Sequence, residues 1–134
     1  MNDMREPRYD WVYDKPRGDV GERLLGEILQ SAEVKTDYQW QKTGNLFIEF
    51  EAWRDGKMQP SGIQTTEAQY WVFVLPVGVK QQIVQCFPTS LIRRMCEGKQ
   101  EIPMNNGSNP TKGYLIKISE IMNKVSEEAR KQSK

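Results

Sequence analysis

Two alternating segments on either side of Lys42-Thr43-Gly44 constrain the fold of this chain more than any other feature. Residues 32–40, AEVKTDYQW, and residues 45–53, NLFIEFEAW, place polar and apolar side chains in turn, which is typical of half-buried strands. A three-residue hairpin loop commonly has a left-handed residue at its third position, and glycine suits that conformation. The sequence therefore predicts a β-hairpin over these residues.

The predicted hairpin sorts its charges onto one face. With Lys42, Thr43 and Gly44 as the loop, Asp37 lies opposite Glu49 and Lys35 lies opposite Glu51, because side chains alternate with a period of two. The other face carries the side chains that we expect in the core, namely Val34, Thr36, Leu46, Ile48 and Phe50.

Opposed acids at cross-strand distance suit a divalent cation. Like charges directly opposite each other destabilise a sheet unless they are neutralised, and Mg²⁺ binds in proteins through one or two carboxylates plus waters. A nearby lysine would stabilise a metal-activated hydroxide that attacks a phosphodiester. The alternative is a solvated sheet face with a Lys35–Glu51 ion pair and no function.

The rest of the chain predicts a mixed α/β layer fold. Residues 1–18 are polar and contain two prolines, so we expect irregular structure or a short strand there, followed by a helix over residues 19–30 capped by Asp19. The further predicted elements are a short helix from Thr65 or Thr66 through Tyr70, strands at 71–76, 80–87 and 114–118, helices at 88–98 and from Ser119 to 132, and a loop at 102–113.

Composition excludes several kinds of site. The 134 residues include no histidine, which removes Ser-His-Asp and Cys-His catalysis, and the two cysteines cannot form a four-ligand zinc site. The length predicts a single domain over residues 1–134. Without an apolar run of about 18 to 20 residues or a signal peptide, we expect a cytoplasmic protein of a cell or of a virus-infected host cell, with no membrane partner.

The segments GE, EVKTD, TGNLFIEFE and SGIQTTEAQYWVFV occur in this order over residues 18–76. This combination resembles the PD-(D/E)XK, or restriction-endonuclease-like, nuclease superfamily, and within it small phage and microbial proteins. The resemblance implies a restriction-endonuclease-like αβββαβ core with a mixed sheet flanked by helices. It also implies dependence on Mg²⁺ or Mn²⁺ and hydrolysis of DNA phosphodiester bonds.

The resemblance also implies metal ligands. Asp37 matches the strand aspartate of the family and Glu49 matches the first acid of its triplet, both of which bind the metal. Glu22 matches the glutamate of the first helix, with Glu27 as the competing position.

The chain departs from the family at the third triplet position, where Glu51 replaces the usual lysine. Glu51 would then be a further ligand or a proton acceptor, and Lys35 would supply the cation from the neighbouring strand. Glu33, two residues before Lys35, would share the metal site or border it.

Two further groups are candidates for substrate binding. Ser61, Thr65, Thr66 and Gln69 match the segment that follows the triplet, where hydroxyls near a helix N-terminus would hold a phosphate; ordinary turn and cap chemistry is the alternative. Arg93 and Arg94 would contact the DNA backbone or simply form a solvated helix face.

The sequence thus predicts a magnesium-dependent endonuclease that acts on DNA. One alternative is a non-catalytic nucleic-acid-binding or interaction protein that retains the nuclease fold. The other is a Holliday junction resolvase, which predicts a homodimer because four-way DNA suits two-fold symmetry.

Overall fold

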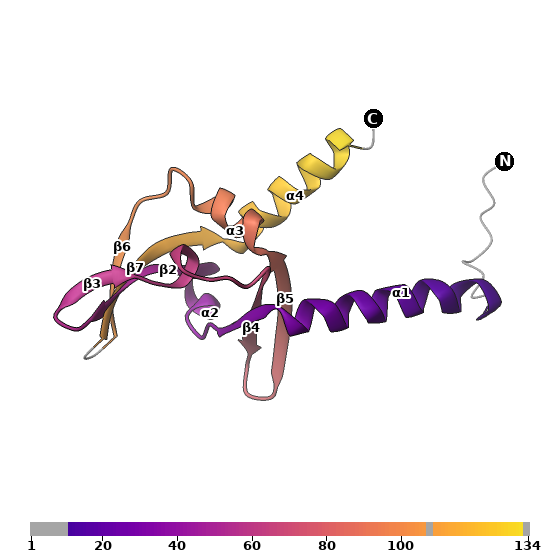
Figure 1. Cartoon of the computed structure of the whole chain (residues 1–134), viewed down its shortest axis with the longest axis horizontal. Coiled ribbons are helices and arrows are strands. Elements are labelled where there is room, and N and C mark those ends of the chain that lie inside the picture. Colours follow the sequence, from indigo (N-terminus) through magenta and orange to yellow (C-terminus); the bar gives the residue numbers. More distant parts are fainter. Residues whose placement is uncertain (1–10, 107–108, 133–134) are drawn as a thin grey trace. The chain divides into compact units, whose positions relative to one another are not determined.

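The computed structural model describes residues 11–106 and 109–132, with side chains from residue 18 onward except at Asn106. The chain divides into two compact units, Met1–Ser31 and Ala32–Lys134. The elements follow one another as α1 (Trp11–Gln30), β1 (Ala32–Thr36), α2 (Trp40–Thr43), β2 (Asn45–Arg54), β3 (Lys57–Pro60), the 3-10 turn η1 (Gly62–Gln64), β4 (Tyr70–Val77), β5 (Gln81–Pro88), α3 (Thr89–Cys96), β6 (Ile102–Asn106), β7 (Asn109–Lys117) and α4 (Ile118–Gln132). Figure 1 labels all of them except β1 and η1.

The first unit contains α1, which is longer than predicted. The helix over residues 19–30 is confirmed, but it begins at Trp11, so the predictions of irregular structure over residues 11–18 and of an Asp19 cap are wrong. Apolar periodicity marks the helix only from Val20 onward, and a helix can continue into polar sequence that lacks this period. The prediction for residues 1–10 lies outside the described residues. No described helix combines the length and apolar character needed to cross a membrane.

The predicted hairpin does not form. β1 pairs in parallel with β4, with Val34 beside Val72, and it stops at Thr36. The chain then turns into α2, which ends at Gly44 with a left-handed φ of 71°. The turn lets Trp40 pack against the core and donate its indole N–H to the Pro76 carbonyl at 2.9 Å. The register that placed Asp37 opposite Glu49 is therefore wrong.

β2 is an inner strand of a four-stranded antiparallel sheet with the order β3-β2-β7-β6. Leu46, Ile48 and Phe50 are buried, as predicted from the alternation. The pairing with β7 is irregular between Glu49 and Glu51, where a β-bulge shifts the register. Because a bulge leaves one residue unpaired, the period of two does not carry across it.

The second sheet has the order β1-β4-β5, in which β5 pairs antiparallel with β4. Glu33 and Lys35 are the register partners of Trp71 and Phe73, so these four side chains share a face. Val34 lies on the other face and is 59% exposed, so the prediction that Val34 and Thr36 enter the core is wrong. The core of the second unit is made by Leu46, Ile48, Phe50, Ile63, Trp71, Phe73, Leu75, Phe87, Leu91, Ile92, Cys96, Ile116 and Ile121.

Elsewhere the strands β4 and β5 and the helices α3 and α4 are confirmed, with small shifts at their ends. Residues 67–70 are not helical, and only η1 precedes β4. Residues 102–106 and 109–113 are strands rather than a loop. Ser119 lies inside α4 rather than at its cap, because the helix begins at Ile118. The described chain is an α/β fold with two sheets and four α-helices.

Candidate active-site groove

A groove with a volume of about 750 Å³ opens in the second unit between β1, the turn that follows it, and β2. Three of the predicted site residues, Lys35, Asp37 and Glu49, lie along it. We refer to this feature as the groove, and its other lining residues are Thr36, Tyr38, Gln39, Thr43, Asn45, Phe47, Trp71, Phe73, Met104, Asn105 and Leu115.

Asp37 is held in the turn by backbone N–H groups. Its Oδ1 accepts hydrogen bonds from the N–H groups of Gln39 at 2.9 Å and Trp40 at 3.2 Å, and its Oδ2 accepts one from Phe47 at 3.3 Å. The first two bonds satisfy donors at the start of α2, as an N-cap side chain does. The third fixes the turn to the edge of β2. Asp37 therefore has a structural role, and it also brings a carboxylate to the groove.

Glu49 reaches the groove from β2. It lies two residues beyond Phe47, which corresponds to about 7 Å along a strand, on the same face of the sheet. Its Oε2 accepts a hydrogen bond from the Ser61 hydroxyl at 2.8 Å, and Ser61 is buried. Among the described residues, no hydrogen bond or ion pair engages Oε1 of Glu49. One oxygen of this carboxylate is thus oriented and the other is available to a ligand.

Lys35 forms an ion pair on its own strand. Its Nζ lies 2.7 Å from Oε1 of Glu33 and 5.6 Å from the centroid of the Trp71 ring, a cation–π distance. Oε2 of Glu33 accepts a hydrogen bond from the Thr66 hydroxyl at 2.8 Å. Burial raises the pKa of Glu33, but the bonds from Lys35 and Thr66 outweigh it and leave this pKa below its ordinary value. The predicted pairing of Lys35 with Glu51 is wrong, and Glu33 takes that place.

Trp71 contributes a buried donor to the wall of the groove. Its side chain is fully buried, and its Nε1 has no hydrogen-bond partner in the described part of the chain. An unpaired buried N–H costs free energy, so the burial of Trp71 must offset this cost.

Glu51 does not line the groove. Burial comes first among the causes that raise the pKa of Tyr114, and the negative charges of Glu101 and Glu51 add to it. The ring of Tyr114 stacks on Phe50, with 4.8 Å between the ring centroids. The bulge between Glu49 and Glu51 accounts for this separation of two acids that the period of two would place together.

The helix glutamates Glu22 and Glu27 lie on α1, in the first unit, and their roles remain predictions. No group of three or more Asp, Glu, Cys or His side chains among the described residues is placed to hold a metal ion. A cation in the groove would therefore take its protein ligands from Asp37 and Glu49 and the rest from water, a ligand set that Mg²⁺ accepts.

The hydroxyls predicted to hold phosphate make contacts within the protein. Ser61 donates to Glu49 and Thr66 donates to Glu33, while the Thr65 hydroxyl lies 3.5 Å from the Gly62 carbonyl. Ser61 and Thr66 thus orient Glu49 and Glu33. Gln69 lines a separate cavity of about 520 Å³, near Thr66 and the start of α3.

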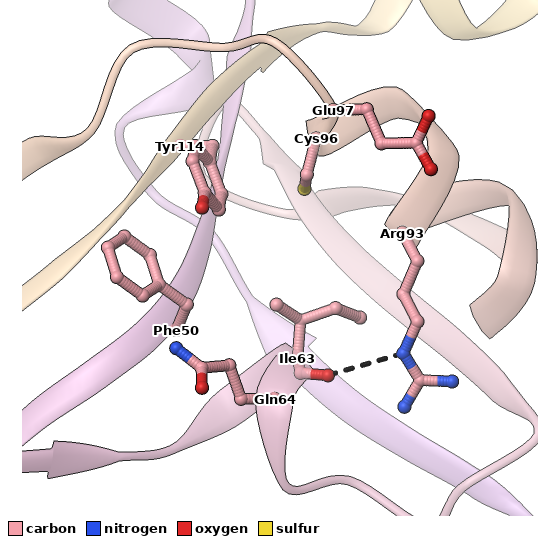
Figure 2. Close-up of a pocket in the computed structure, with 7 residues that line it drawn as sticks. All are labelled: Phe50, Ile63, Gln64, Arg93, Cys96, Glu97 and Tyr114. Atoms are coloured by element: carbon pink, nitrogen blue, oxygen red, sulfur yellow. Dashed lines mark hydrogen bonds between the residues drawn. The ribbon is translucent and has the colours of Figure 1, made fainter.

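Arg93 points into a smaller cavity of about 370 Å³, shown in Figure 2. Its Nε donates to the Ile63 carbonyl at 3.4 Å and its Nη2 to the Thr66 carbonyl at 3.2 Å. Burial raises the pKa of Cys96 in the cavity wall to about 11, although Lys99 acts in the opposite direction, so this cysteine stays a thiol. The other lining residues are Phe50, Gln64, Glu97 and Tyr114. The neighbouring Arg94 pairs with Glu128 at 2.8 Å.

Sequence reasoning missed the uncharged lining of the groove. Phe47 shares the face of Glu49, so the alternation of β2 was a signal that could have found it. Tyr38, which is 70% exposed, follows Asp37 in the turn and was assigned to a strand. Asn105 was assigned to a loop, and no local signal indicated that β6 borders the groove.

Comparisons with models of protein families, with curated proteins and with solved structures found no match to this chain. The assignment of function therefore depends on the groove and on the resemblance in sequence.

Proposed function

We propose that this protein is a metal-dependent nuclease that hydrolyses DNA phosphodiester bonds in the groove. The observation that carries the proposal is that Lys35, Asp37 and Glu49 line one groove although they come from a strand edge, a turn and a second sheet. Mg²⁺ or Mn²⁺ held there would activate water for attack on phosphorus. The restriction-endonuclease-like core is part of this proposal.

The three charged side chains of the groove and their partners have defined tasks in this proposal. Asp37 and Glu49 bind the cation, Asp37 through a carboxylate already fixed by the backbone and Glu49 through its available Oε1. Ser61 orients Glu49. Lys35, kept in place by Glu33 and the Trp71 ring, stabilises the negative charge that develops on the phosphate.

One observation favours the second candidate, a nucleic-acid-binding protein without catalysis. Both oxygens of Asp37 already accept hydrogen bonds from the backbone, and Lys35 already has a carboxylate partner. A groove with these contacts can bind a nucleic acid without holding a catalytic metal.

A cleavage assay with Mg²⁺ or Mn²⁺ on duplex, single-stranded and branched DNA distinguishes the two candidates. Glu49→Gln keeps the acceptor for Ser61 and removes the charge, so we expect cleavage to fall at least about a hundredfold, since even outer partners of a metal site cost about 10- to 100-fold. Glu51→Gln is the matched control, because it makes the same change two residues away and outside the groove, and it should leave cleavage nearly unchanged.

If the natural chain cleaves DNA and Glu49→Gln cleaves it equally well, the assigned site is wrong. DNA binding with no cleavage of any of these substrates would favour the binding protein. A loss of cleavage in Glu51→Gln equal to that in Glu49→Gln would mean that the bulge does not separate the two acids in function.

A further inference from the structure

β5 forms one edge of its sheet and lacks the features by which natural proteins protect such edges. In the described chain the sheet order is β1-β4-β5, and β5 has eight residues, QQIVQCFP. Edge strands are usually short, or they carry charged residues, internal prolines or bulges that prevent pairing with another chain. β5 has no charged side chain, and its proline, Pro88, is its last residue. β5 therefore resembles an edge strand that pairs with a strand of another chain.

The hydrogen bonds of β4 show which backbone groups of β5 point outward. The Asp37 N–H donates to the Val74 carbonyl, so the backbone groups of Val74 point toward β1. Val74 is the register partner of Val84. Because the backbone groups of Val74 point toward β1, the two residues form a non-hydrogen-bonded antiparallel pair, in which both residues point their N–H and C=O groups away from each other. The N–H and C=O groups of Val84 therefore point out from the sheet edge, and by alternation so do those of Gln82 and Cys86.

The same residues present their side chains on an exposed face. Val84 is 63% exposed and Val34, on the same face of β1, is 59% exposed. Cys86 is also exposed and has no disulfide partner. The open edge of β5 thus borders an uncharged, largely apolar surface, which a second strand with the same composition would extend without opposing like charges.

We propose that β5 pairs antiparallel with β5 of a second copy of this chain, with Val84 on the two-fold axis opposite Val84 of the second copy. In this register Gln82 lies opposite Cys86 of the second copy, and the outward N–H and C=O groups of all three residues are paired. The contact is self-complementary, as a two-fold interface must be. The two sheets become one. The proposal goes beyond the nuclease assignment and does not depend on it, because no residue of β5 lines the groove.

Sedimentation velocity of the full chain under reducing conditions tests the association. We expect a dimer for the natural chain. Val84→Lys places two like charges directly opposite each other and should abolish the dimer over the same concentrations. Val79→Lys is the matched control, because it adds the same charge at a 97% exposed position in the β4–β5 turn and should leave the dimer intact. Circular dichroism establishes that both variants are folded.

A cross-linking experiment tests the register without relying on a disruptive variant. Residues at opposite hydrogen-bonded positions have Cα atoms about 5.5 Å apart, within the usual disulfide range. Gln82→Cys should therefore form an intermolecular disulfide with the natural Cys86 on mild oxidation. Val79→Cys should not cross-link, and Cys86→Ser should abolish the cross-link in the Gln82→Cys chain.

Three results would overturn the proposal. The first is a natural chain that remains monomeric at every concentration. A chain that binds an unrelated extended peptide but does not pair with its own copy also counts as this result. The second is a dimer that Val84→Lys leaves intact. The third is a dimer in which Gln82→Cys cross-links no more than Val79→Cys.

Discussion

The two acids of the groove are held in different ways. Asp37 accepts hydrogen bonds from three backbone N–H groups and joins the turn to β2, whereas Glu49 projects from a regular strand and accepts one hydrogen bond from the Ser61 hydroxyl. A carboxylate bound by the backbone is part of the fold. A carboxylate bound by one side chain can change with little effect on the fold. The two positions should therefore separate stability from activity.

The largest expected effect concerns the backbone of Glu49 rather than its carboxylate. Gly62 has a left-handed φ of 52°, and a Cβ atom there would overlap the Glu49 carbonyl. Gly62→Ala should lower the free energy of unfolding by about 3 kcal/mol or more, because strain and overpacking add. Urea unfolding measures the loss.

Gly56→Ala is the control for that change. Gly56 also has a positive φ, of 78°, but a Cβ there would meet no atom within 4 Å. The cost should be only the strain of a left-handed residue, about 1–2 kcal/mol. Equal losses in the two variants would mean that the contact between Gly62 and Glu49 adds nothing.

Removing the carboxylate of Asp37 should have the next largest effect. Asp37→Ala leaves the N–H groups of Gln39, Trp40 and Phe47 without their acceptor, so we expect the free energy of unfolding to fall by about 2 kcal/mol. Asp37→Asn keeps one oxygen and should lose less. If Asp37→Ala unfolds at the same urea concentration as the natural chain, Asp37 is not a structural residue.

Glu49→Gln should change stability much less than Asp37→Ala does. The amide oxygen still accepts the Ser61 hydroxyl, so we expect a change below about 0.5 kcal/mol, the usual range for a substitution that removes no structural contact. The same urea titration provides the comparison with Asp37→Ala. A loss as large as that of Asp37→Ala would remove the distinction between the two acids.

The smallest effect is a dependence on pH that arises from Glu33. Its pKa is below the ordinary value of 4.5, so its charged form is stabilised by folding. Its contribution to stability is fully present above pH 4.5 and is lost as the pH falls through the lowered pKa of the folded state. Glu33→Gln should flatten this part of the profile, measured as urea midpoints at a series of acidic pH values. An unchanged profile would mean that the contacts with Lys35 and Thr66 do not favour the charged form.

Local sequence signals predicted β2 well. Its alternation and the burial of Leu46, Ile48 and Phe50 follow from side-chain geometry within one strand. Gly44 is left-handed as predicted, but it ends α2 instead of closing a hairpin loop. The partner of β1 was not predictable in this way. Pairing with β4 joins residues far apart in the sequence, and no local pattern reports which two strands become neighbours.

The sequence did not predict how the groove is built. Asp37 and Glu49 both line it, but Asp37 does so from a turn bound to the edge of β2 instead of a cross-strand pair, and their role as metal ligands stays a prediction. Glu33 rather than Glu51 is the partner of Lys35, because the expected register does not exist. The uncharged lining depends on β6 and on the turn, both of which were assigned to other structures.

The bulge in β2 has a consequence for redesign of the protein. A lysine introduced at position 51, to match the triplet of the nuclease superfamily that the sequence resembles, would begin on the side of the strand that faces Tyr114, away from Glu49. In a regular strand, residues i and i+2 lie on the same face, but they do not when a bulge leaves the residue between them unpaired. Attempts to alter the positive charge of the groove should therefore change residues of β1 and leave residues 49–51 unchanged.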